Sequence, residues 1–333
     1  MNVIESVNQA LKECLQEEPR VWFLGEDVLD PYGGAFKAAR GLSTSYPDRV
    51  MTTPVSEAGI VGLGVGMALR GFKPVVEIMF GDFIMLAADQ LVNHAAKLRW
   101  MSNGQARVPL VVRTPMGGGR GYGPTHSQSL EKHLLGTPGL TVVAISALGD
   151  PVAVLKHAVL KHDDPVLVIE HKRLYTRPVL SLDELDEFSV YEEGDGFPTY
   201  RLAIQGAPSP RFTLAAYGFM AELAREAALR LAYEHELFAE LIVPTRLAPA
   251  DWRPLRESIQ ATHRLVAIEE GARSLGWGSE VIASALEWHG SGLAARRVAA
   301  KDQPVPAAGP LEEAMLPQVD DIVDGVLDLA AQD

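Results

Sequence analysis

The amino-acid sequence predicts an α/β protein with two doubly wound sheet domains. Short apolar segments of strand length alternate with longer helical segments, and this alternation occurs once in each half of the chain. A segment rich in acidic residues, glycine and proline separates the two halves. Such alternation is typical of a parallel sheet with helices on both faces. With 333 residues, of which 47% are hydrophobic and 22% charged, the chain can form two hydrophobic cores.

The first half begins with a helix and a buried strand. Apolar side chains recur at helical spacing through residues 3–15, and residues 21–24 then form a short run of large apolar side chains. Further strands are expected at 74–79, 108–113, 140–145 and 165–170. Helices are expected at about 57–70, 83–101, 127–135 and 150–162.

The second half repeats the alternation. Strands are expected at 212–217, 239–243, 264–269 and 295–299, with helices near 220–234, 252–259, 276–287 and 318–331. We therefore divide the chain into a first domain over 1–185, a linker over 186–210 and a second domain over 211–333. The acidic residues between Asp183 and Asp195 favour a solvated linker, although a docking site for a basic partner stays open.

The composition restricts the partners and the location of the protein. A formal net charge of −13 argues against nucleic acid, because binding a phosphate backbone requires clustered Lys and Arg. The single cysteine, Cys14, excludes an intramolecular disulfide and fits a reducing cytosol. The first residues lack the features of a signal peptide, and no stretch approaches the roughly 20 continuous apolar residues of a membrane span. We expect a soluble, cytoplasmic protein.

Glu57 is the most unusual residue of the first half. The sequence that follows it is apolar on every side, which is the pattern of a helix buried all round. A carboxylate at the start of such a helix is poorly solvated and can serve as a proton donor or shuttle. The alternative is that Ser56 caps the helix and that Glu57 only complements the helix dipole.

A series of motifs extends from this segment along most of the chain. Taken together, their order and spacing resemble the β subunit of thiamine-diphosphate-dependent 2-oxoacid dehydrogenases, the decarboxylating component of the pyruvate, branched-chain and acetoin types, in the transketolase-like superfamily. The resemblance implies a pyrimidine-binding domain followed by a transketolase C-terminal domain; only residues 175–211 look unlike the family. The motifs are Gly25-Glu26-Asp27-Val28, Ser56-Glu57-Ala58-Gly59-Ile60-Val61-Gly62, Asp89-Gln90-Leu91-Val92-Asn93, His126-Ser127-Gln128-Ser129, Glu269-Glu270-Gly271 and Gly276-Trp277-Gly278-Ser279-Glu280.

The resemblance assigns roles to five residues. Glu57 matches the glutamate that hydrogen-bonds the aminopyrimidine ring of thiamine diphosphate, where ring protonation leads to the nucleophilic ylide. His126 matches the active-site histidine, which can stabilise a developing alkoxide or pass a proton. Phe83 matches the aromatic residue that stacks on the aminopyrimidine, against the alternative of core packing. Glu26 lies just after the expected strand 21–24 and Met79 ends the expected strand 74–79, and both are assigned to cofactor binding.

The chain lacks the other half of the cofactor site. Magnesium and the diphosphate are usually held by a Gly-Asp-Gly motif closed by an Asn about thirty residues later. Gly194-Asp195-Gly196 lies in the acidic segment, and no Asn follows Asn103, so we reject it as a magnesium site. The resemblance implies an α subunit that supplies these ligands in an α2β2 heterotetramer. The segments 57–70 and 83–101 are possible interface elements or ordinary core.

Two further features of the first half bear on ligand binding. The family often binds a monovalent cation, for which K+ is the candidate here, and the turn with Leu160, His162 and Asp164 is the corresponding place. The glycine-rich stretch 117–123 has no following Lys-Ser/Thr, so it is not a phosphate-binding P-loop, and we expect a flexible loop near the site entrance.

The resemblance implies oxidative decarboxylation of a 2-oxo acid, with acyl transfer to the lipoyl arm of a separate acyltransferase core. An enzyme of the same cofactor class with another acceptor, in acyloin formation or cleavage or in a biosynthetic pathway, stays open. A non-catalytic subunit that keeps the fold as a scaffold is a third reading, against which Glu57 and His126 both argue. The substrate itself is not defined by this sequence.

Overall fold

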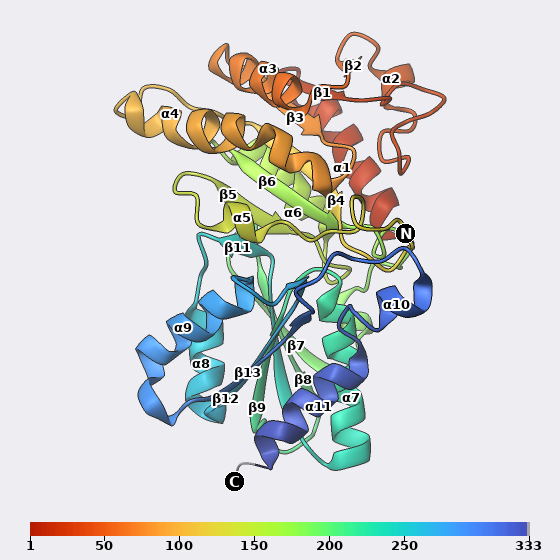
Figure 1. Ribbon diagram of the computed structural model, residues 1–333. Helices are drawn as coiled ribbons and strands as arrows, with labels where there is room; N and C mark the ends of the chain where they lie inside the picture. Colours follow the sequence, from red (N-terminus) through yellow and green to blue (C-terminus); the bar gives the residue numbers. More distant parts are fainter. Residues whose placement is uncertain (332–333) are drawn as a thin grey trace. The chain divides into compact units, whose positions relative to one another are not determined.

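The computed structural model describes residues 1–331, and the chain divides into two compact units (Figure 1). The N-terminal unit comprises Met1–Met116, His133–Val179 and Leu247–Pro249. The C-terminal unit comprises Gly117–Lys132, Leu180–Arg246 and the chain from Ala250 onward. The predicted fold class is confirmed, because each unit is a sheet with flanking helices. Within residues 1–331, no helix has the combined length and apolarity that a bilayer crossing requires.

The N-terminal unit is built on a seven-stranded sheet in the order β11-β5-β6-β4-β3-β1-β2. The pairs β1–β2, β1–β3, β3–β4, β4–β6 and β5–β6 are all parallel. Every residue of the central strands β3, β4 and β6 is buried, which is typical of a parallel sheet covered on both faces. The strands are β1 (Val21–Gly25), β2 (Val50–Thr52), β3 (Lys73–Glu77), β4 (Val111–Met116), β5 (Thr141–Ala144), β6 (Val166–His171) and β11 (Arg246–Ala248).

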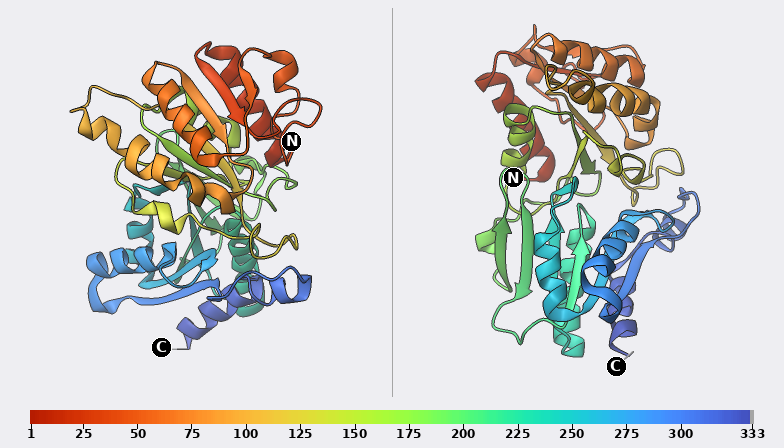
Figure 2. Two further views of the ribbon diagram at one scale, coloured as in Figure 1. Left: turned by 45° about the horizontal axis from the view of Figure 1, so that its top comes forward. Right: turned by 90° about the vertical axis from the view of Figure 1, so that its left-hand side faces the viewer.

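Helices cover both faces of this sheet (Figure 2). On one face α1 (Val3–Glu17) packs against α6 (Pro151–Lys156), which η3 (His157–Lys161) continues as a π-helix. On the other face α3 (Glu57–Leu69) packs against β3 and against the 3₁₀- and π-helical stretches η1 (Gly81–Ala87) and η2 (Gln90–Ala95). The helix α4 (Ala96–Met101) follows, and α2 (Leu42–Ser45) is a short helix before β2.

The expectation that the helix at 57–70 is buried all round is wrong for the single chain. Leu63 and Leu69 of α3 are 46% and 47% exposed, whereas Ile60, Val61 and Val65 are buried. The packed face of α3 is the one toward β3, η1 and η2. The apolar sequence of α3 therefore exceeds what the core of this chain alone can cover.

The C-terminal unit holds a six-stranded sheet in the order β13-β12-β9-β10-β8-β7. The four strands from β13 to β10 are parallel, whereas β8 pairs antiparallel with both β10 and β7. In Figure 1, α7 and α11 lie on one face of the sheet, and α8 and α9 lie on the other. The elements are β9 (Phe212–Ala216), α7 (Met220–His235), β10 (Ala239–Pro244), α8 (Arg253–Thr262), β12 (Arg264–Ala272), α9 (Trp277–His289), β13 (Ala294–Ala300), α10 (Gly309–Glu313) and α11 (Val319–Ala330).

The segment 186–210, expected to be an acidic linker, instead forms a β-hairpin at the edge of this sheet. Its strands are β7 (Phe188–Glu193) and β8 (Thr199–Ile204), visible in green in Figure 2. Phe188, Tyr200 and Leu202 are buried, while the acidic side chains face solvent. This alternation is the pattern of an antiparallel strand with one wet face, and the high acid content concealed it.

The helix expected at 127–135 is also wrong in extent. Only α5 (Lys132–Leu135) is helical. The backbone before it closes a loop instead, because the Gly117 N–H donates to the Gln128 carbonyl at 3.1 Å. The Gln128 carbonyl is therefore engaged in the loop and not in a helix.

Candidate functional site

The carboxyl ends of β1 and β3 form the switch point of the N-terminal sheet. The chain goes from β1 outward to β2 and then returns to the other side of β1 with β3. Ligands of open parallel sheets bind outside the carboxyl ends of the strands at such a point. Glu26 directly follows β1, and Met79 and Phe80 closely follow β3. Sequence reasoning had assigned Glu26 and Met79 to cofactor binding, and both lie at this edge.

Glu57 is the first residue of α3, the helix that follows β2. Ser56 is the N-cap, and its hydroxyl accepts a hydrogen bond from the Gly59 N–H at 3.3 Å. The cap expected from the sequence is thus present. Because Ser56 provides it, the carboxylate of Glu57 is not needed for capping. Glu57 is nevertheless only 7% exposed.

Glu26 lies beside Glu57 and is similarly buried, at 6% exposure. Burial raises the pKa of Glu26, the Glu57 carboxylate raises it further, and a hydrogen bond from the Ser56 N–H partly offsets both effects. The Oε1 atom of Glu26 is buried and has no hydrogen-bond partner within residues 1–331. A buried acceptor without a partner is uncommon and calls for an explanation. The structure therefore brings two buried carboxylates together, one of them with an unused oxygen.

An aromatic cluster extends from the same edge. Phe83 contacts Phe80 with ring centroids 6.2 Å apart, and Phe80 contacts Phe36 at 5.3 Å. Phe36 contacts Tyr175 at 5.3 Å in turn. Phe83 is at the end of this series and is only half-buried. Phe83 therefore combines an edge contact with Phe80 and partial exposure, and its stacking on a cofactor ring stays a prediction.

A buried ion cluster lies behind the aromatic residues. Arg113, 1% exposed, donates from Nε and Nη2 to the two carboxylate oxygens of Glu170 at 2.8 and 2.5 Å and from Nη1 to Glu77. The Tyr175 hydroxyl also donates to Glu170, at 2.6 Å. Gly34 covers Glu77, and because its φ is +82° and a Cβ there would lie 2.7 Å from Glu77 Oε1, only glycine fits. Glu77 of the cluster thus lies against Gly34, in the loop that follows Glu26.

His126 lies in a turn of the C-terminal unit, whereas Glu57, Phe83, Glu26 and Met79 belong to the N-terminal unit. Its Nδ1 is 3.0 Å from the Thr125 hydroxyl, and its backbone N–H donates to the Gly123 carbonyl at 3.2 Å. The ring is half-buried. It thus has the accessibility that was expected of it.

Sequence reasoning missed two residues that hold the loop before His126. Glu270, in β12, accepts a hydrogen bond from the Gly118 N–H at 2.8 Å. Glu312, in α10, accepts from the N–H groups of Gly119 and Gly121, both at 2.8 Å. The expectation of a flexible loop is therefore corrected to a loop bound by two carboxylates. The partners are 152 to 193 residues apart, and no local pattern reveals such pairs.

The turn expected to bind a monovalent cation has protein partners in the structure. The Lys73 ammonium donates to the Leu160 carbonyl at 2.6 Å, and Asp164 pairs with Arg99. His162 Nε2 is 3.2 Å from the Thr141 hydroxyl. The cation stays a prediction. The rejected motif with Asp195 lies between β7 and β8.

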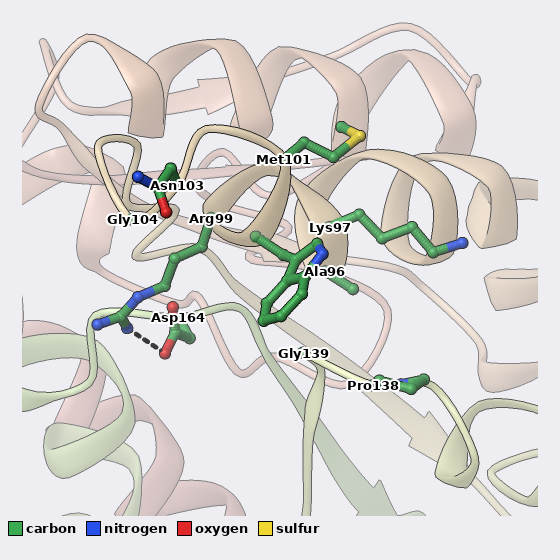
Figure 3. Close-up of a pocket in the computed structure, with 10 residues that line it drawn as sticks. Ala96, Lys97, Arg99, Met101, Asn103, Gly104, Pro138, Gly139 and Asp164 are labelled. Carbon is green, nitrogen blue, oxygen red and sulfur yellow. Dashed lines mark hydrogen bonds and ion pairs between the residues drawn. The ribbon is translucent and has the colours of Figure 1, made fainter.

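A separate pocket of about 1040 Å³ opens on the N-terminal unit around α4 (Figure 3). The Arg99–Asp164 ion pair lies on one side of it, and Pro138 and Gly139 lie on another. Trp100, which also lines it, is 89% exposed. This pocket lies beside α4, which follows η1 and η2 along the chain. Neither Glu26 nor Met79 is among the residues that line it.

Two family models match the chain. The transketolase pyrimidine-binding domain matches residues 1–178, and the transketolase C-terminal domain matches residues 203–322. Among solved structures, one described as "Split gene transketolase, inactive beta4 tetramer" superposes with a TM-score of 0.76 over 99% of this chain and 98% of that chain. It is 22% identical, so this likeness concerns the fold alone.

Curated relatives are considerably closer in sequence. The chain is 38% identical to the mitochondrial pyruvate dehydrogenase E1 component subunit beta-1 of Arabidopsis thaliana, over 97% of this chain and 87% of that protein. It is 35% identical to the 3-methyl-2-oxobutanoate dehydrogenase subunit beta of Mycobacterium tuberculosis, over 98% of this chain and 91% of that protein. The resemblance seen in the motifs is thus confirmed over nearly the full length. The chain belongs to the family of β subunits of pyruvate and branched-chain 2-oxoacid dehydrogenases.

Proposed function

We propose that this chain, together with an α subunit, catalyses the thiamine-diphosphate-dependent oxidative decarboxylation of a 2-oxo acid and passes the acyl group to a lipoyl acyltransferase. The observation that carries the proposal is the pair of buried carboxylates, Glu26 and Glu57, at the switch point of the N-terminal sheet. Family membership supports the reaction class.

The residues at the switch point fit the aminopyrimidine half of thiamine diphosphate. That ring needs a group that exchanges a proton with a ring nitrogen, and the buried Glu57 carboxyl is suited to this. The unpartnered Glu26 Oε1 can accept a hydrogen bond from a donor on the bound ring. The half-buried Phe83 offers an apolar ring face for stacking. When bound, the cofactor supplies the carbon nucleophile for the oxo acid and accepts the electron pair left by carbon dioxide.

His126 provides the second function of the proposed site. Its imidazole can donate a hydrogen bond to the substrate oxygen that becomes negatively charged, or transfer a proton to it. The Thr125 hydroxyl, 3.0 Å from Nδ1, selects the orientation of the ring. In this proposal Glu57 exchanges a proton with the cofactor ring. His126 donates a hydrogen bond or a proton to the substrate oxygen.

An α subunit is the proposed partner. The relatives are named as β subunits of an E1 component, and nothing in the sequence supplies the diphosphate and Mg²⁺ ligands, which we assign to the α chain. Exposed apolar side chains on α3, η1 and α4 support an extensive interface, since such surface is seldom left to solvent. These are Leu63, Leu69, Met85, Leu86, Trp100 and Met101, with exposures of 42 to 89%. An α2β2 assembly located in the cytoplasm is part of the proposal.

The test measures decarboxylation of a panel of 2-oxo acids with an artificial electron acceptor. The panel includes pyruvate and 3-methyl-2-oxobutanoate, because the names of the relatives contain these two oxo acids. The chain is assayed with and without its co-encoded α partner and with and without thiamine diphosphate and Mg²⁺. Activity that requires both chains and the cofactor supports the proposal and names the substrate. A well-formed complex that decarboxylates no oxo acid would overturn it, and acyloin formation would then be assayed.

A further inference from the structure

The glycine-rich loop before His126 is fixed by carboxylates at both ends of the segment that carries the histidine. Upstream, Glu312 Oε1 and Oε2 each accept one backbone hydrogen bond, from Gly119 and Gly121 respectively. Downstream, the Ser129 hydroxyl donates to Glu270 Oε1 at 3.1 Å. His126 therefore lies between an anchor at Gly121 and an anchor at Ser129.

The loop backbone is shaped for these contacts. Gly119 and Gly121 have φ values of +78° and +71°, so their N–H groups converge on one side in a way that L-residues rarely allow. Convergent backbone N–H groups form a concave anion-binding site. At Gly118, a Cβ would lie 2.6 Å from Leu316 and 3.2 Å from Glu312 Oε1. The glycines thus let the backbone reach the carboxylate directly.

The Glu312 carboxylate needs the hydrogen bonds of the loop, just as the loop amides need the carboxylate as their acceptor. The side chain is only 4% exposed, and its polar partners within residues 1–331 are the two glycine amides. A buried carboxylate is costly unless hydrogen bonds satisfy it. Loss of the loop conformation would therefore leave both the amides and the carboxylate unpaired.

We propose that Glu312 and Glu270 form a carboxylate clamp that positions His126 for proton transfer, acting through the glycine-rich loop. The inference rests on the proposed function, because it assigns the clamp to the histidine of that site. Glu312 and Glu270 are positioning residues; they act on the loop backbone and on Ser129. A small displacement of a catalytic group lowers turnover far more than it lowers affinity.

The test compares Glu312→Gln with Glu313→Gln in the complex with the α partner. Glutamine keeps the size of the side chain but turns one acceptor oxygen into an NH₂ group that opposes a glycine N–H. Glu313 is the exposed neighbour and serves as the matched control. We expect Glu312→Gln to lower kcat by about 10- to 100-fold with little change in KM, and the control to leave both unchanged.

Hydrogen exchange provides a readout that does not depend on turnover. Peptides covering residues 117–129 should exchange at least about tenfold faster in Glu312→Gln than in Glu313→Gln, because two amides lose their acceptor geometry. Peptides from α1 and β9 should be unchanged, which shows that the variant is folded. Ser129→Ala, which removes only the downstream anchor, should produce a smaller change in the same direction.

The outcomes separate the clamp from the proposed function. Equal exchange and equal kcat in Glu312→Gln and Glu313→Gln would overturn the clamp, as would faster exchange with unchanged kcat. If the wild-type complex has no decarboxylase activity, the proposed function fails, while the exchange data still decide whether the carboxylates hold the loop. Full activity of His126→Ala would overturn the role of the clamp in positioning this histidine.

Discussion

The Glu57 carboxylate lies close enough to Glu26 to raise the pKa of the Glu26 carboxyl group, in addition to the larger effect of burial. Both residues are almost completely buried, and Glu26 Oε1 has no partner within residues 1–331. Two adjacent buried carboxylates repel each other and are poorly solvated, which is unfavourable for folding. Such an arrangement is typical of a functional site, where a ligand completes the missing contacts.

Glu57→Gln should lower kcat for 2-oxo acid decarboxylation by about 10²- to 10⁴-fold, because glutamine cannot exchange a proton with the cofactor ring. The assay uses the complex with the α partner at saturating thiamine diphosphate. Glu226→Gln, an exposed substitution on α7, is the control and should retain full activity. A Glu57→Gln complex with wild-type kcat would remove Glu57 from the mechanism.

Glu26→Gln should remove an acid limb from the pH dependence of kcat/KM. Since the pKa of Glu26 is raised, its carboxylate becomes protonated at a higher pH than an ordinary glutamate. Activity that needs the ionised form therefore falls as pH decreases through this raised pKa. The limb should be absent in the variant, and rates of both proteins measured from pH 5 upward decide the question. An identical limb in both proteins would assign it to another group.

Glu269→Gln should stabilise the protein at alkaline pH. Burial raises the pKa of Glu269 to about 7 from 4.5, in spite of hydrogen bonds from the Gly278 and Trp277 N–H groups. Between these values the unfolded chain releases the proton that the folded chain keeps, so stability falls as pH rises from about 4.5 to 7. Removing this titration should stabilise the variant at pH 8 by on the order of 1–3 kcal/mol, and hardly at all near pH 4.5.

Thermal melts of wild type and Glu269→Gln across this pH range measure the difference. Glu287→Gln, an exposed substitution on α9, controls for the loss of one negative charge. A constant difference in Tm between Glu269→Gln and wild type at all pH values would contradict the assignment.

Arg113→Met should destabilise the N-terminal unit by about 3–5 kcal/mol, because it leaves Glu77 and Glu170 buried without a cation. Arg107→Met is the matched control, since Arg107 pairs with Asp163 at an exposed position. The control should change stability by less than about 1 kcal/mol. Denaturant unfolding of both variants measures the contrast, and similar midpoints would show that the buried cluster contributes little.

Trp100→Glu should weaken assembly with the α subunit by about tenfold or more, because exposed aromatic residues are the usual anchors of interfaces. Trp100 is 89% exposed on α4. Tyr233→Glu replaces another exposed aromatic residue, 73% exposed on α7, and is the control. Sedimentation of the mixed chains gives the populations of free and assembled species. Wild-type assembly by the Trp100 variant would place the interface elsewhere.

Local patterns in the sequence were sufficient to predict elements that depend only on near neighbours. The apolar run at 21–24 became β1, and the Ser56-Glu57 start became the capped beginning of α3. These elements depend on neighbours within a few residues, which periodicity and capping chemistry describe well. The family motifs likewise singled out Glu57, Phe83 and His126, and the roles of these residues stay predictions.

Contacts beyond near neighbours could not be predicted from the sequence and were revealed only by the tertiary structure. The hairpin β7–β8 was missed because solvated acidic side chains on one face hid the buried Phe188 and Leu202 on the other. The short α5 was overestimated because residues before it pair with Gly117. In both cases pairing beyond the immediate neighbours outweighed the local preference, since β8 also pairs with β10 and the Gly117 N–H pairs with the Gln128 carbonyl.

The sequence by itself determined the two-domain α/β fold class, the family and the residues that carry the proposed chemistry. Only the tertiary structure decided that Glu26 and Glu57 share one buried site and that Glu312 and Glu270 hold the loop of His126. The physical reason is that secondary structure and motifs arise from contacts between near neighbours. Burial, charge coupling and loop anchoring arise instead from pairs brought together by folding, and the sequence alone does not state which pairs these are.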